Sequence, residues 1–195
     1  MFKRNLILTE NIIAKSPATR NLTILVRLFL LTSTLLMSGC LWVKNNESSA
    51  ANVTGVNHTS ANINTFTVNG AGGPNIGPYH DGSGKQQCCV MLPDKWYPGM
   101  QASIEWETDP NPTEDIPMKT RGFRYEEKAY AKHAANYQQH SAVVDIPQYD
   151  HACALVVHFL TCNQVKVTTA CSGYGQPDYP IKEPLHMKEP ATCPK

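Results

Sequence analysis

The stretch QASIEWE, residues 101–107, alternates strictly between polar and apolar side chains. Successive side chains of a strand point to opposite faces, so this period of two is typical of a strand with one buried face. The predicted buried face holds Ala102, Ile104 and Trp106. This is the clearest secondary-structure signal in the chain, and it predicts a sheet with one face on a hydrophobic core.

Five further segments have the composition of short strands. Phe66 and Val68 alternate with polar residues, as do Val165 and Val167. The run CALVVHFL is apolar on both faces except at His158, which predicts a central strand. The five segments are NTFTVNG (64–70), QCCVML (87–92), SAVVDIP (141–147), CALVVHFL (153–160) and QVKVTTA (164–170).

One segment between these strands has helical character instead. Tyr125, Ala129, His133 and Tyr137 recur every four residues, with good helix formers between them. Short strands separated by Gly and Pro turns predict a mainly β fold, a compact β-sandwich with one inserted α-helix. The Gly-rich segment 70–84 lacks the Lys-Ser/Thr ending of a phosphate-binding loop, so we expect a flexible surface loop there.

The N-terminal region is typical of a bacterial lipoprotein signal peptide, residues 1–39. Its apolar run, 28–37, is preceded by basic residues and is too short to span a membrane, which takes about 20 apolar residues. The sequence MSGC, residues 37–40, matches the lipobox, in which the cysteine is acylated and the chain is cut before it. Fatty acids such as palmitate on Cys40 would anchor the chain, and Leu41 in place of Asp predicts the outer membrane, facing the periplasm. The alternatives are an ordinary secretory peptide and an uncleaved anchor.

The chain from residue 40 onward has the length of one ordinary domain. Residues 40–62 are rich in Asn, Ser, Thr and Ala without an apolar period, which predicts a flexible tether. A β-rich domain is expected over 63–180 and an extended Pro-rich tail over 181–195. This part holds 12 of the 17 Lys and Arg and 15 of the 16 Asp and Glu, a net charge near −3. No basic cluster with interleaved aromatics is recognised, so nucleic acid is not an expected partner.

Cysteine usage indicates disulfide bonds. An even number of cysteines in an oxidising compartment predicts disulfides, and six cysteines allow 15 pairings among which the sequence does not choose. Cys88 and Cys89 are adjacent in a predicted strand, so their side chains should point to opposite faces and bond different partners. The disulfide candidates are Cys88, Cys89, Cys153, Cys162, Cys171 and Cys193.

Two alternatives to the disulfides stay open. The first is a metal site that combines these thiols with His80, His151 or His158, although no C-x-x-C or H-x-x-x-H spacing supports it. The second is that some of the thiols are free and buried, Cys153 above all.

Catalytic motifs are not recognised: the chain has neither a G-x-S-x-G elbow nor an H-E-x-x-H helix. Glu105 and Glu107 share a strand face, where paired acids are usually solvated rather than catalytic. The sequence therefore predicts no catalytic residue, no cofactor and no small-molecule substrate. Trp96 and Tyr97 lie in a predicted turn, where such rings either cap a core or anchor a binding surface.

Several features between residues 68 and 180 together resemble one family. These are the Gly-rich stretch, Cys88-Cys89, Leu92-Pro93, Trp96 with Pro98-Gly99, the Trp106 strand, Ile146-Pro147 with Tyr149, Val157-His158-Phe159, and Pro177-Asp178-Tyr179-Pro180. The chain is similar to Gram-negative lipoproteins long listed only as a domain of unknown function. Members of that family are typically encoded beside type VI secretion phospholipase effectors, as Tli-type immunity lipoproteins. Cys153, Cys162 and Cys171 are additional to the usual pattern of the family.

The resemblance implies an immunity protein that binds a secreted phospholipase effector and neutralises it. We expect its partner-binding surface to include Tyr79 and His80 of the Gly-rich segment and Trp96 and Tyr97 of the turn. The alternative function is that of a non-catalytic structural or assembly lipoprotein of the cell envelope or the secretion machinery.

Overall fold

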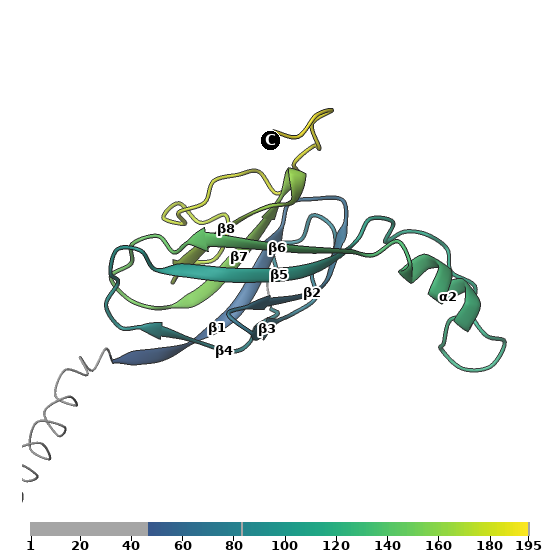
Figure 1. Cartoon of the computed structure of the whole chain (residues 1–195), viewed down its shortest axis with the longest axis horizontal. Coiled ribbons are helices and arrows are strands. Elements are labelled where there is room, and N and C mark those ends of the chain that lie inside the picture. Colours follow the sequence, from purple (N-terminus) through teal and green to yellow (C-terminus); the bar gives the residue numbers. More distant parts are fainter. Residues whose placement is uncertain (1–46, 83, 195) are drawn as a thin grey trace, which may run out of the picture. The chain divides into compact units, whose positions relative to one another are not determined.

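The computed structural model describes residues 47–82 and 84–194, which form two four-stranded sheets (Figure 1). The first sheet has the strand order β4-β1-β7-β8, and the second has the order β3-β2-β5-β6. The strands are β1 (Ser48–Asn57), β2 (Asn62–Val68), β3 (Ala71–Gly73), β4 (Gln87–Pro93), β5 (Gln101–Asp109), β6 (Gln138–Asp145), β7 (Ala154–Leu160) and β8 (Gln164–Ala170). The predicted mainly β fold with one short helix is confirmed.

β5, which contains the alternating residues 101–107, is an inner strand of the second sheet. β5 pairs antiparallel with β2 on one side and with β6 on the other. Ala102, Ile104 and Trp106 are buried in the core between the sheets, while Glu105 is exposed. The strand and its buried face are therefore as predicted.

The centre of the first sheet is formed by β1 and β7. β7 pairs in parallel with β1 and antiparallel with β8, so both of its edges are hydrogen-bonded. Leu155, Val156 and Val157 are all buried, which means that both faces of the strand are covered. The prediction of a central strand over 153–160 is confirmed.

Aromatic rings join the two sheets. Phe66 of β2 and Phe159 of β7 lie with their ring centroids 5.1 Å apart at an interplanar angle of 71°. Trp106 of β5 completes the cluster, with its centroid 5.9 Å from that of Phe159. Edge-to-face pairs of this kind add about 1 kcal/mol to the gain from burial.

The flexible tether predicted over residues 40–62 is wrong for its ten residues 48–57, because they form β1. Val53 and Val56 are buried, and β1 is hydrogen-bonded on both sides, by β4 and β7. Asn57 illustrates why the polar composition misled: its side-chain amide donates to the carbonyl oxygens of Ala61 and Gly77, at 2.7 and 2.9 Å. A polar residue that fastens a buried turn cannot be distinguished in sequence from one in a tether.

The Gly-rich segment is packed against the sandwich rather than being the flexible surface loop predicted. Its first residues form β3, and Ile76 is fully buried in a bridge with Ile63 of β2. Gly82 has a φ of +67°, and a Cβ atom there would lie 1.9 Å from the carbonyl oxygen of Gly55 in β1. The glycine is therefore required for close approach of two backbones.

The helix predicted from the repeat 125–137 is confirmed as α2 (Glu127–Ala134), which is shorter than the repeat. A 3-10 turn, η2 (Thr161–Asn163), joins β7 to β8. No helix in the described part of the chain is long and apolar enough to cross a membrane. The predicted signal peptide, 1–39, and Cys40 lie outside the described residues.

Residues 181–194 form no helix or strand, as expected for the extended tail. This segment lies against the sandwich, because the backbone N–H of Met187 donates to the carbonyl oxygen of His58 at 3.0 Å. The tail therefore takes part in the folded domain.

Candidate functional site

The predicted turn residues Trp96 and Tyr97 have different roles. Trp96 is half-buried against the core, and its Nε1–H donates to the carbonyl oxygen of Ile146 at 2.9 Å. Its ring therefore caps the core, which was one of the two interpretations. Tyr97 is exposed, so of the two only this ring is freely available to a partner.

The other two predicted binding residues lie at the opposite end of the first sheet. Tyr79 stacks on His186 of the tail with ring centroids 4.5 Å apart, and His80 forms a bridge with Asn57 at the end of β1. The other end of β1, at Ser48, pairs with Pro93, which lies just before the turn that contains Trp96. The structure therefore does not bring the four predicted residues into one surface.

A different exposed surface lies on the connection between β5 and β6, residues 110–137, which we call the arm. The arm carries α2 and projects from one end of the sandwich (Figure 1). Phe123 is fully exposed, at 102 %, and Met118, Tyr125 and Tyr130 are more than 40 % exposed. These are four of the seven exposed large hydrophobic side chains among the described residues. Clustering of such side chains is typical of an interaction site.

The end of the arm is a closed hairpin. The N–H of Lys119 donates to the carbonyl oxygen of Arg124 at 2.8 Å, and the N–H of Glu126 donates to that of Pro117 at 2.8 Å. Gly122 has a φ of +89°, which favours glycine at the turn. The backbone that presents Phe123 is thus ordered by its own hydrogen bonds.

The root of the arm is fastened by His133 of α2. Its Nε2 lies 2.9 Å from Asp109 Oδ2 at the end of β5, and its Nδ1 lies 2.8 Å from Glu114 Oε2. Hydrogen bonds to Glu114 and Asp109 raise the pKa of His133 above its usual value. Because both ring nitrogens face carboxylates, the ring donates from both as an imidazolium. This buried contact joins the helix to the second sheet.

Charge is unevenly divided between the arm and the rest of the molecule. Residues 118–132 hold five basic and two acidic side chains, while the other described residues hold five basic and thirteen acidic ones. The signal in the sequence is the interleaving of Lys119, Arg121 and Arg124 with Phe123 and Tyr125, which the expectation of no basic cluster with aromatics overlooked. The exposure of Phe123 follows only from the structure.

The predicted disulfides are confirmed, and they include all six cysteines after Cys40. Cys153 pairs with Cys171, and Cys162 pairs with Cys193. The second bond connects the β7–β8 turn to the tail, which it holds against the sandwich. The alternative that Cys153 is a free buried thiol is therefore wrong.

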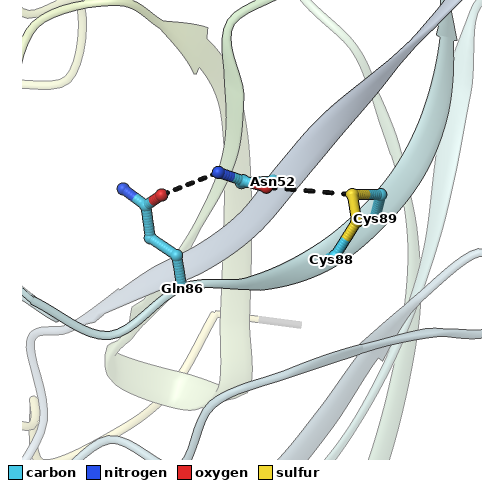
Figure 2. The surroundings of a disulfide bond; sticks show 4 residues. All are labelled: Asn52, Gln86, Cys88 and Cys89. Atoms are coloured by element: carbon cyan, nitrogen blue, oxygen red, sulfur yellow. Dashed lines mark hydrogen bonds between the residues drawn. A yellow bond between two sulfur atoms is a disulfide. The ribbon is translucent and has the colours of Figure 1, made fainter.

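Cys88 and Cys89 bond to each other, so the prediction of different partners was wrong. The two residues are neighbours in β4, and the peptide bond between them is cis. Figure 2 shows Asn52 of β1 beside this disulfide. The Oδ1 atom of Asn52 lies 3.8 Å from Cys89 Sγ, and its Nδ2 donates to Gln86 Oε1 at 2.9 Å.

The metal alternative is not supported by the described residues. Cys162, Glu189 and Cys193 lie within 4.8 Å of one another, but the two sulfurs are joined in a disulfide and offer no thiolate. Glu189 Oε2 instead accepts a hydrogen bond from the backbone N–H of Cys162 at 3.0 Å.

Glu107, one of the acidic pair on β5, is held by neighbouring amides. Asn64 Nδ2 donates to Glu107 Oε1 at 2.9 Å, and Gln139 Nε2 donates to Glu107 Oε2 at 2.5 Å. Glu105 remains exposed on the surface of the sheet. These hydrogen bonds from neighbouring strands give Glu107 a structural role.

A buried chain of hydrogen bonds connects the tail to the first sheet. Tyr179 Oη lies 2.7 Å from His158 Nε2, His158 Nδ1 lies 2.8 Å from His58 Nε2, and His58 Nδ1 lies 2.8 Å from the carbonyl oxygen of Pro184. Because a carbonyl only accepts, His58 Nδ1 carries a proton, and for neutral rings His158 Nδ1 and Tyr179 Oη donate in turn. Burial and the neighbouring His58 lower the pKa of His158 to about 3, and burial lowers that of His58.

We expect this chain to make the fold acid-sensitive. Neutral His158 is favoured in the folded state and protonated His158 in the unfolded state, so its stabilisation is complete above pH 6.5 and is lost as the pH falls toward 3. At pH 5 the loss from His158 alone amounts to about 2 kcal/mol. Guanidinium denaturation at pH 7 and pH 5 measures it.

The matched variants are His158→Gln and His133→Gln. The first removes the buried group that excludes the proton, so the difference between pH 7 and pH 5 should shrink. The second removes His133, whose pKa is raised. Its contribution to stability is complete below pH 6.5 and is lost above it, so the loss of stability between pH 7 and pH 5 should remain in this variant. An unchanged acid difference in His158→Gln would contradict the assignment.

Comparison with known proteins identifies the family of the chain and no individual relative. No curated protein and no solved structure matches the chain. The resemblance to a family of unknown function is confirmed at that level. The model of the DUF3304 family, described as a protein of unknown function, matches residues 56–167, more than half of the chain, and the protein therefore belongs to this family.

Proposed function

We propose that the protein is a lipoprotein anchored through Cys40, facing the periplasm, that binds a type VI secretion phospholipase effector and neutralises it. The outer membrane is its proposed location. The role requires a binding surface and no chemistry of its own.

The arrangement of the cysteines carries this proposal. The six cysteines after residue 40 are joined in three disulfides. Cys40, the cysteine of the lipobox, is the one cysteine that these disulfides do not include. Disulfides persist in oxidising compartments such as the periplasm, and a lipobox cysteine is consumed by acylation. Both observations agree with an exported chain that is attached to a membrane at residue 40.

Binding rather than catalysis is supported by the surface of the described residues. The buried histidines His58 and His158 serve the hydrogen-bond chain to the tail, and Glu107 is held by two amides. The arm, by contrast, exposes four large hydrophobic side chains. An inhibitor held at the membrane also reaches a high local concentration where a phospholipase acts.

Replacement of the lipobox cysteine tests the proposal. We expect Cys40→Ser to lose labelling by radioactive palmitate and its membrane association. Survival of cells that receive the phospholipase encoded beside the gene should then fall roughly 100-fold relative to the wild type, because the local concentration is lost. Ser38→Ala, which keeps a small residue before the cysteine, should retain label and protection.

Two results would contradict the proposal. Absence of palmitate label on the wild type would refute the anchor. Killing of cells that contain the labelled wild type would refute immunity, and would favour a structural or assembly lipoprotein instead.

A further inference from the structure

The geometry points to the arm as the docking element for a protein partner, with Phe123 inserted into an apolar pocket whose rim is acidic. This inference rests on the proposed function in taking the phospholipase as that partner. The proposed binding surface is therefore the arm, and not the four binding residues that were predicted from the sequence.

Phe123 is presented in the manner of an interface anchor. It is fully exposed at the end of a hairpin closed by the Lys119–Arg124 and Glu126–Pro117 hydrogen bonds. An ordered backbone loses little conformational entropy on binding, so more of the gain from burying the ring becomes affinity. Aromatic side chains that fill a partner's pocket are the residues that dominate binding energies.

Three further exposed hydrophobic side chains, Met118, Tyr125 and Tyr130, lie on the arm with Phe123. Tyr125 and Tyr130 stack with ring centroids 5.9 Å apart and planes 2° from parallel, and both are exposed. Met118 forms a bridge with Tyr125 across the hairpin. A ring of such contacts excludes water from a central anchor.

Charge defines the partner's surface. Arg121 and Arg124 flank Phe123 and are exposed, and residues 118–132 carry a formal charge of +3. The other described residues carry −8, so the arm is the region that an acidic surface would approach. Complementary charge steers association and orients the partner on the arm.

The position of the arm favours a protein over the bilayer. β1 begins at Ser48, whose partner Pro93 leads into the turn before β5, while the arm begins after Asp109, at the far end of β5 (Figure 1). An anchor on Cys40 would join the chain eight residues before Ser48, the first residue of β1. The arm therefore projects from the end of the sandwich opposite the start of β1, where a protein partner can reach it (Figure 1).

Variants of the purified full-length lipoprotein, measured for binding to the phospholipase encoded beside its gene, test the inference. Phe123→Ala should weaken the affinity at least about 30-fold. Arg121→Glu should slow association at least about tenfold at low salt. The matched controls are Tyr97→Ala and Lys95→Glu, an exposed aromatic and an exposed base with the same spacing in the β4–β5 turn, and they should change the affinity less than about twofold.

The outcomes separate the two proposals. Equal affinity of Phe123→Ala and wild type, with protection intact, would overturn the arm and leave the function standing. Absence of wild-type binding would overturn both. Benzoylphenylalanine placed at position 123 in cells should cross-link to the phospholipase, and cross-linking to phosphorus-labelled lipid instead would assign the arm to the bilayer and overturn the protein partner.

Discussion

Phe66→Ala should cost the protein 3–5 kcal/mol of its free energy of unfolding, roughly the range for removing a buried phenylalanine ring. Phe66 is 2 % exposed and packs edge to face on Phe159 of the other sheet. A Cβ atom at Gly73 would lie 1.9 Å from Cζ of Phe66, so β3 is fitted directly against the ring. Truncation leaves a cavity between the sheets that β3 and Phe159 cannot fill. Guanidinium denaturation of the full chain measures the loss.

Phe123→Ala is the matched control, because it removes the same ring from a fully exposed site. It should change the free energy of unfolding by less than about 0.5 kcal/mol. A loss below about 1 kcal/mol for Phe66→Ala would contradict the packing of the two sheets described here. The same pair of variants separates stability from binding, since only Phe123→Ala should weaken the complex while the fold is kept.

Removal of the Cys162–Cys193 disulfide, by replacing both cysteines with alanine, should cost about 3–4 kcal/mol. The bond spans 31 residues and closes a long loop, so its loss returns much conformational entropy to the unfolded chain. It also holds the tail, which supplies the carbonyl oxygen of Pro184 to the buried His58. Chemical denaturation measures the loss, and proteolysis of the tail should quicken in the variant.

The Cys88–Cys89 pair provides the comparison. These residues are adjacent, so the same chain-entropy argument assigns their bond only about 1 kcal/mol. Equal losses for the two double variants would show that loop closure is not the source of the stabilisation.

Local pattern was sufficient for most of the strands and insufficient for the candidate site. Ala102, Ile104 and Trp106 could be assigned to a buried face because a period of two has one structural meaning. The four predicted binding residues do not share one surface, and the sequence could not show this. An aromatic side chain in a turn looks the same whether it caps a core, as Trp96 does, or is free, as Tyr97 is. Exposure depends on what the rest of the chain places around a residue.

The sequence by itself determined six of the strands, the helix and the use of cysteines in disulfides, because alternation, periodicity and cysteine number are properties of the chain alone. Only the tertiary structure decided that residues 48–57 form a central strand, that Cys88 bonds Cys89, and that the arm stands clear of the sandwich with Phe123 in solvent. Each of these depends on contacts between residues distant in the chain or on a backbone geometry that side-chain identity does not encode. Such contacts are settled by the packing of the whole domain.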